Sequence, residues 1–168
     1  MKNGDPDALR ILYTRYKDFL LTLANALLHE QNSAEDALHE VFVRFTRNIA
    51  AFRLTGTLKA YLSVSIANEA RSQLRRRKLH AASSDFAVEP PAQASPCPVE
   101  SQETAERLRR HLAALPDEQR EVVVLRAKGG LTFKEIAAIQ QTGIPTVQGR
   151  YRYGIEKLRV LLNGELEK

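Results

Sequence analysis

Apolar residues recur at three- and four-residue intervals through most of the chain, which is the period of amphipathic α-helices. No run of alternating apolar and polar residues stands between turn signals, so we expect no strands. The pattern therefore predicts an all-α protein whose helices fall into two halves. In the first half, helices are predicted over residues 7–30, 33–48 and 58–78.

The second of these helices has a start signal and a charged face. Ser33 is a suitable cap, which would place Glu35 and Asp36 in a first turn where carboxylates are favourable. Asp36, His39 and Glu40 are spaced three and four residues apart, so they are predicted to share one exposed acidic patch.

Residues 131–162 have the outline of a helix-turn-helix. Thr132 and Glu135 have the spacing of a capping box, which predicts the start of a short helix. Gly143 permits a left-handed bend, and Pro145 suits the first turn of a second helix because its missing amide needs no partner there. One apolar stripe of that second helix is predicted to face the core, and it consists of Val147, Tyr151, Ile155, Leu158 and Leu162.

The opposite side of the second helix is polar and basic near its N-terminal end. That end reaches base edges when such a helix lies in a major groove of DNA. The residues concerned are Gln148, Gly149, Arg150, Arg152 and Tyr153. The alternative is an ordinary pair of amphipathic helices whose arginines only meet solvent.

Composition and charge limit the class of partner. The chain has 168 residues and a net charge of +5, which favours an anionic partner for one or two small domains. No apolar run approaches the ~20 residues that span a bilayer, and no signal peptide is recognisable, so we expect no membrane insertion and a cytoplasmic location.

Cys97 is the lone cysteine, which excludes an intramolecular disulfide and a cysteine-rich zinc site. It fits an incidental linker thiol better than a redox switch.

A change of composition at residues 80–100 divides the chain. Four prolines among alanines and serines predict a flexible linker between a domain at residues 1–79 and another at 101–168. No Lys or Arg occurs in residues 80–106, while several acidic residues do. This negative charge either simply keeps the segment soluble or suits a segment that lies inside a basic channel.

The third predicted helix ends in a basic cluster that follows Asn68. Such a cluster favours phosphate contacts, although a run of charge is more often only a solvated face. Asn68 has an amide edge that can read a base, but it can equally face water or bond to a neighbour. The basic residues are Arg71, Arg75, Arg76, Arg77 and Lys78.

Several fragments follow one another in a distinctive order. The first half contains AEDALHEVFVRF at residues 34–45, AYLSVSIANEA at 60–70 and LRRRK at 74–78. The second half contains LPDEQREVVVLR at 115–126, KEIAAI at 134–139 and TVQGRYRYGIEKLR at 146–159. In this order and spacing the chain resembles the extracytoplasmic-function (ECF) sigma factors, the compact branch of the bacterial primary-sigma family.

The resemblance covers nearly the whole chain and carries expectations about its fold and function. It implies a three- to four-helix bundle (sigma domain two) and a helix-turn-helix (sigma domain four), joined by the linker. It further implies a protein that is no enzyme, uses no cofactor or metal and directs promoter-specific transcription initiation. Many relatives have a further short helix before the segment that matches Gly4-Asp5, so this N-terminus is expected to be short or truncated.

Core RNA polymerase is the first partner that the resemblance implies. Domain two of the family docks on the clamp coiled coil, a basic surface, and the flap is a second contact. An anti-sigma factor is a further candidate partner, and the acidic linker would run through the basic cleft and RNA exit path. His39 stands where Gln is more usual, so the strength of docking can vary with pH. The positions that match the clamp-binding surface are Glu35, Asp36, His39 and Glu40.

Promoter DNA is the second implied partner, and domain two would bind its single-stranded minus-ten element. The loop at residues 52–57 and the helix after it match the segment that holds a base turned out of the stack. Arginines there would contact phosphates, and Asn68 with the loop would read bases. The candidates are Arg53, Thr55, Asn68, Arg71, Arg75 and Arg76.

Domain four would bind the minus-thirty-five element in the major groove. Gln148 suits adenine, and Arg152 or Arg150 suits guanine. Gly149 would let the backbone come close to the DNA. Gln141 stands where relatives often have Gly, so the turn geometry departs from the family. The full set of candidates is Arg126, Thr132, Lys134, Thr146, Gln148, Gly149, Arg150, Arg152 and Tyr153.

Two other classes of protein compete with the sigma-factor interpretation. A conventional helix-turn-helix regulator would need a ligand pocket or self-association surface and would not need an acidic clamp-binding helix. A recombinase or nuclease would need clustered carboxylates for metal ions or an activated nucleophile. Glu35, Asp36 and Glu40 are the acids with helical pairing, and no distant acidic or His cluster matches them.

Overall fold

The computed structural model describes residues 6–49, 51–54, 56–83 and 99–166. Within these ranges every regular element is an α-helix, which confirms the predicted fold class. The chain divides into two compact units, Met1–Pro91 and Ala92–Lys168. Cys97 and most of the predicted linker lie outside the described residues. No helix in the described ranges has the length and apolar character needed to cross a membrane.

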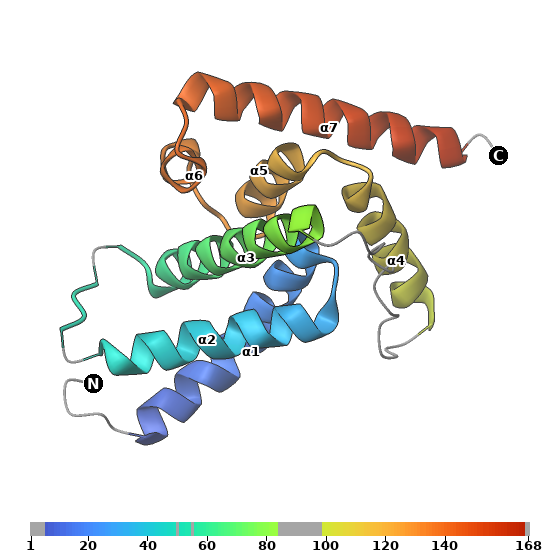
Figure 1. Cartoon of the computed structure of the whole chain (residues 1–168). Coiled ribbons are helices and arrows are strands. Elements are labelled where there is room, and N and C mark those ends of the chain that lie inside the picture. Colours follow the sequence, from blue (N-terminus) through green and yellow to red (C-terminus); the bar gives the residue numbers. More distant parts are fainter. Residues whose placement is uncertain (1–5, 50, 55, 84–98, 167–168) are drawn as a thin grey trace. The chain divides into compact units, whose positions relative to one another are not determined.

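The described part of the first unit is a bundle of three helices, α1 (Pro6–Leu28), α2 (Gln31–Arg47) and α3 (Leu58–Ser83), in which each helix packs on the other two (Figure 1). Their apolar faces meet in one core, as the helical period predicts. The largest fully buried side chains of this core are Leu20, Leu23, Val41, Leu62 and Ile66.

The start of α2 differs from the prediction, because Ser33 is not its cap. The helix begins at Gln31, and the cap position belongs to Glu30, whose backbone is extended. The Ser33 hydroxyl instead donates a hydrogen bond to the Glu30 carboxylate at 2.9 Å. Glu35 and Asp36 consequently lie beyond the first turn of α2.

Both ends of the predicted linker are helical. α3 continues past Lys78 to Ser83, and α4 of the second unit already begins at Val99. Alanine and serine at residues 81–83 can continue a helix, whereas the predicted boundary depended on the prolines that follow. Residues 80–83 and 99–100, which the sequence assigns to the linker, therefore belong to α3 and α4.

Within residues 99–166, the second unit contains four helices, α4 (Val99–Ala113), α5 (Asp117–Ala127), α6 (Phe133–Gln140) and α7 (Ile144–Leu166). The long α7 packs on α4, α5 and α6. Its buried positions include Val147 and Leu158, which lie in the core as predicted.

The predicted apolar stripe of α7 is only partly correct. Ile155 is 40% exposed and Leu162 is 39% exposed, so neither belongs to the core. Gly154 is the buried residue at that turn of the helix. A Cβ atom at Gly154 would lie 2.9 Å from the Val123 Cγ2 atom and 3.5 Å from the Gln119 carbonyl oxygen. The missing side chain therefore lets α7 approach α5 closely.

Candidate DNA and polymerase interfaces

The start of α6 is held by the predicted capping box. The Thr132 hydroxyl accepts a hydrogen bond from the Glu135 amide at 3.2 Å, and the Thr132 amide donates to the Glu135 carboxylate at 2.7 Å. Hydrogen bonds from the Thr132 backbone and then from its hydroxyl lower the pKa of Glu135 below its ordinary value. The Thr132 hydroxyl is thus committed to the cap, and the residue defines where α6 begins.

The turn between α6 and α7 bends at a different residue from the one predicted. Gln141 adopts the left-handed conformation, with φ 52° and ψ 45°, and caps the C-terminus of α6. Gly143 has no positive φ. Pro145 lies in the first turn of α7, as predicted. A left-handed residue directly after a helix is a common C-terminal cap, usually Gly, so Gln141 carries backbone strain here.

The N-terminal end of α7 exposes most of its predicted base-reading side chains. Thr146, Gln148, Arg152 and Tyr153 are all exposed. The Arg152 guanidinium lies 5.1 Å from the centre of the Tyr153 ring, so the ring restricts where the arginine points. Gly149 is half-buried, and a Cβ atom added to it would meet no neighbouring atom within 4 Å.

Arg150 is placed differently from the other candidates on α7. Its Nη1 donates to the Gln140 side-chain oxygen at 2.7 Å. The Gln140 amide nitrogen in turn donates to the Glu121 carboxylate at 2.6 Å and to the Glu118 carbonyl at 3.1 Å. Arg150 is therefore part of a polar chain that joins α5, α6 and α7. Sequence reasoning missed Gln140 and Glu121 because their partners lie 10 and 19 positions away, beyond the reach of the helical period.

The other candidates of the second unit flank α6. Arg126 donates through Nη1 to the Leu131 carbonyl at 2.9 Å, and its guanidinium lies 5.0 Å from the centre of the Phe133 ring. Phe133 in turn meets Tyr151 of α7 edge to face, with the ring centres 5.5 Å apart. Lys134 and Arg126 are both exposed. Arg126 thus helps to fix the loop before α6 while keeping an exposed side.

The predicted polymerase-binding residues form an exposed face on α2. Glu35, Asp36, His39 and Glu40 are all exposed. Glu35 accepts a hydrogen bond from Gln31 at 3.0 Å, and Glu40 pairs with Arg44 at 3.1 Å. The acidic face therefore has one of its carboxylates already paired with an arginine.

The minus-ten candidates lie on α3 and on the loop before it. Asn68, Arg53 and Arg75 are exposed, and Arg71 is half-buried. Thr55 lies outside the described residues. From the basic end of α3, Arg77 pairs with Glu30 and Ser33 of the first unit. Part of the predicted basic cluster therefore holds α3 against the segment that starts α2.

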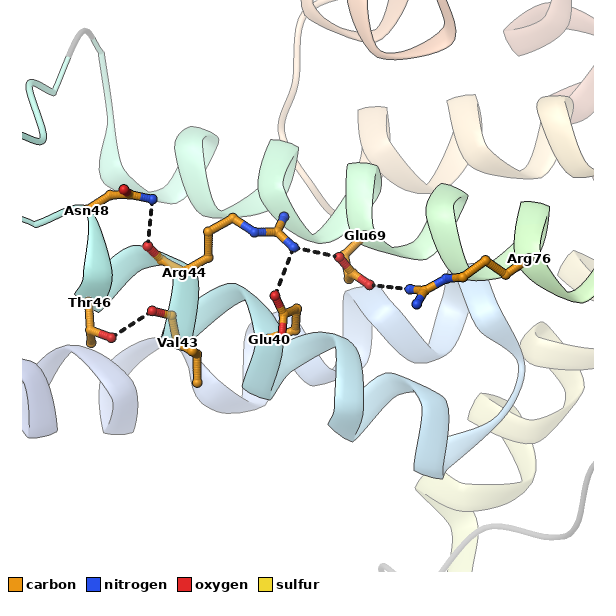
Figure 2. Close-up of polar contacts among 7 residues, drawn as sticks. All are labelled: Glu40, Val43, Arg44, Thr46, Asn48, Glu69 and Arg76. Carbon is orange, nitrogen blue, oxygen red and sulfur yellow. Dashed lines mark hydrogen bonds and ion pairs between the residues drawn. The ribbon is translucent and has the colours of Figure 1, made fainter.

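Arg76 is also paired, and its partner was not predicted. Glu69 of α3 accepts a hydrogen bond from Arg76 at 3.0 Å through Oε1 and one from Arg44 of α2 at 3.0 Å through Oε2 (Figure 2). The hydrogen bond to Glu69, followed by the one to Glu40, raises the pKa of Arg44 above its ordinary value. Only 7% of the Glu69 side chain is exposed, so its two arginines neutralise a nearly buried carboxylate.

These ion pairs line an open polar groove of about 820 Å³ between α2 and α3. The groove brings together residues from two candidate sets that are far apart in sequence. Asp36, His39 and Glu40 belong to the polymerase-binding set, and Arg76 belongs to the minus-ten set. Among the described residues, no three potential metal ligands gather at one place.

The loop before α3 is anchored by aromatic side chains. Phe52 meets Phe45 of α2 and Tyr61 of α3, with ring centres 5.2 Å and 4.7 Å apart. Thr57 accepts a hydrogen bond from the Ala60 amide at 3.2 Å at the start of α3. Both ends of the segment that carries Arg53 are therefore fixed to the bundle.

Family models match both units of the chain. Sigma-70 region 2 matches residues 12–80, and Sigma-70 region 4 matches residues 111–160. The RNA polymerase sigma factor CarQ of Myxococcus xanthus is 31% identical over 99% of this chain and 95% of its own length. The ECF RNA polymerase sigma factor SigW of Bacillus subtilis is 27% identical over 95% of this chain and 91% of its own length.

Solved structures share the fold. The sigma factor RpoE of Bartonella quintana, in complex with the anti-sigma factor NepR, has a TM-score of 0.74 and 24% identity, covering 92% of this chain and 98% of that one. CnrH, in complex with the cytosolic domain of CnrY, has a TM-score of 0.67 and 22% identity, covering 97% of this chain and 92% of that one. The chain therefore belongs to the ECF group of the sigma-70 family, non-catalytic sigma factors that bind core RNA polymerase and direct transcription initiation.

Proposed function

We propose that this sigma factor grips promoter DNA at two points, with α7 in the major groove of the minus-thirty-five element and α3 with its preceding loop on the minus-ten strand. The observation that carries this proposal is the exposed pair Gln148 and Arg152 at the N-terminal end of α7. That end of a recognition helix is the part that reaches base edges. A capped α6 and the tight α5–α7 packing support α7 from behind.

In the minus-thirty-five interface, base reading and phosphate binding fall to different residues. Gln148 bonds adenine and Arg152 bonds guanine, each good pair giving ~1–3 kcal/mol of discrimination. Lys134 and the outer side of Arg126 contact phosphates and set the register. Arg150 acts indirectly, because its bond to Gln140 supports the orientation of α7.

In the minus-ten interface, Asn68 and the anchored loop hold an extruded base, while Arg53, Arg71 and Arg75 contact phosphates. Contacts to that base offset the cost of unstacking, which is a few kcal/mol. Strand opening and recognition are then one event that requires no nucleotide hydrolysis.

Polymerase docking is assigned to the exposed face of α2, where Glu35, Asp36, His39 and Glu40 meet the basic clamp coiled coil. The second unit contacts the flap, and the acidic linker follows the basic cleft towards the RNA exit path. Because that partner works on chromosomal DNA, the protein acts in the cytoplasm. An anti-sigma factor is a further proposed partner, since RpoE of Bartonella quintana shares this fold and is bound to one.

The decisive experiment mixes the purified chain with core RNA polymerase and measures complex formation and promoter-dependent transcription. We expect a stable complex that initiates only at promoters with both elements. Charge-reversed Glu35→Lys and Glu40→Lys variants should lose the complex, whereas Arg152→Ala should keep the complex and lose promoter preference. Stable, specific DNA binding by the free chain without polymerase association would instead support the conventional regulator.

A further inference from the structure

Glu69 belongs to neither predicted surface, yet it touches both. Its carboxylate binds Arg44, which also pairs with Glu40 on the polymerase face of α2. It also binds Arg76, a member of the minus-ten set on α3. The four side chains form a row of alternating charge, Glu40, Arg44, Glu69 and Arg76 (Figure 2), and Glu69 is its nearly buried member.

One amino group of Arg44 serves two carboxylates at nearly equal distances. Its Nη2 lies 3.1 Å from Glu40 Oε1 and 3.0 Å from Glu69 Oε2. If a cationic side chain of a partner pairs with Glu40, Arg44 keeps Glu69 as its one carboxylate partner in this row. Arg44 would then neutralise the Glu69 carboxylate more completely, and the attraction between Glu69 and Arg76 would weaken.

Arg76 has the exposure needed to change partners. Its side chain is 61% exposed, whereas that of Glu69 is 7% exposed. A nearly buried carboxylate without a cation is strongly unfavourable, so Arg76 can leave only if Arg44 stays. A backbone phosphate is a suitable new acceptor, because it forms strong charge-assisted hydrogen bonds with a guanidinium.

We propose that Glu69 is a positioning residue that withholds Arg76 from DNA phosphate in the free protein, and that polymerase docking at Glu40 releases Arg76. This inference rests on the proposed function and adds a coupling between its two surfaces. Because such coupling is reciprocal, single-stranded DNA should raise the affinity for polymerase by the factor by which polymerase raises the affinity for DNA.

The first test uses the full chain without polymerase, titrated against a fluorescein-labelled single-stranded oligothymidylate and followed by anisotropy. Glu69→Gln should bind roughly fivefold more tightly than wild type, a modest coupling. The slope of log affinity against log salt should steepen by ~0.7, the value of one added phosphate contact on a single strand. Glu69→Gln combined with Arg76→Ala should show neither gain.

Glu35→Gln is the matched control, since it removes the same charge from the first unit without touching Arg44. A gain in Glu69→Gln no larger than in this control would overturn the proposal, as would a gain that survives Arg76→Ala. Circular dichroism checks that each variant is folded.

A second variant avoids the buried position. Glu40→Gln, at a half-exposed site, removes the carboxylate that polymerase would otherwise capture. It should bind the oligothymidylate about twofold more tightly than Glu35→Gln, as expected from one exposed ion pair. Equal affinities of the two variants would overturn the release step, even if Glu69→Gln fails to fold. Neither titration contains polymerase, so failure of the proposed function would appear separately, as the absence of a polymerase complex.

Discussion

The two units of this sigma factor fix an arginine of a basic helix in opposite ways. In the first unit, Arg76 of α3 forms an ion pair at an open groove and remains largely exposed. In the second, Arg150 of α7 binds the neutral amide of Gln140, which is 6% exposed and backed by buried Glu121. Arg76 is mostly exposed and shares the Glu69 carboxylate with Arg44, so it can change partners while Arg44 stays, whereas a buried polar chain is costly to interrupt. The first arrangement suits a contact that changes, and the second suits one that does not.

The largest expected effect tests the buried side of this comparison. Gln140→Ala leaves the Glu121 carboxylate and the Arg150 guanidinium without their shared partner, so we expect a loss of about 2–3 kcal/mol in the free energy of unfolding. Urea unfolding followed by circular dichroism measures it. Gln148→Ala, at an exposed position, should stay within about 0.5 kcal/mol of wild type. Similar losses in both variants would remove the distinction between the two arrangements.

A second prediction separates a base contact from a phosphate contact in the second unit. Arg152→Ala should change the preference at one minus-thirty-five base by about 1–3 kcal/mol. Lys134→Ala should weaken binding to all promoters and reduce the salt slope by roughly one unit. Competition binding of the polymerase complex to single-base promoter variants distinguishes them. A uniform loss in both variants would contradict this division of roles.

Two glycines of α7 should respond with opposite signs to the same substitution. Gly154→Ala places a Cβ 2.9 Å from Val123, so the strain should outweigh the gain in helix propensity and cost about 1 kcal/mol. Gly149→Ala meets no atom within 4 Å and should stabilise the protein by about 0.5–1 kcal/mol. Thermal unfolding measures both. Stabilisation by Gly154→Ala would show that α5 and α7 tolerate separation.

The smallest effect is a pH dependence at the start of α6. Because folding lowers the pKa of Glu135, its ionised form stabilises the protein above the unfolded pKa of about 4.3, and this contribution is lost as pH falls through the folded value. Glu135→Gln should therefore be about 0.5–1 kcal/mol less stable than wild type at neutral pH. The difference should shrink in acid, as urea unfolding across a pH series would show. A difference in stability that does not change with pH would show that ionisation of the Glu135 carboxylate is not its cause.

Local patterns predicted much of this fold. The capping box of Thr132 and Glu135 and the place of Pro145 in the first turn of α7 depend on residues close in sequence, and both are confirmed. The left-handed residue was assigned to Gly143 because Gly has no Cβ penalty, but the end of α6 places it at Gln141. Intrinsic preference was outweighed there by the packing that fixes where the helix ends.

The partners of charged side chains could not be predicted in the same way. A run of arginines indicates a basic surface, yet Glu69 and Arg44 are 25 positions apart, and Gln140 and Arg150 are 10 apart. Such pairs form only after the helices pack, and the spacing of residues within one helix does not predict them. The residues of the candidate interfaces could therefore be predicted, whereas the hydrogen-bond partners of Arg76 and Arg150 could not.

The aromatic anchor of Phe52 has a consequence for the entropy of binding. Its contacts with Phe45 and Tyr61 hold one end of the loop, and the start of α3 holds the other. A chain segment with both ends fixed has already lost much of the freedom that a loose segment must lose on binding. Capture of a base by this loop should then cost little additional ordering, so more of the contact energy remains available to oppose strand pairing.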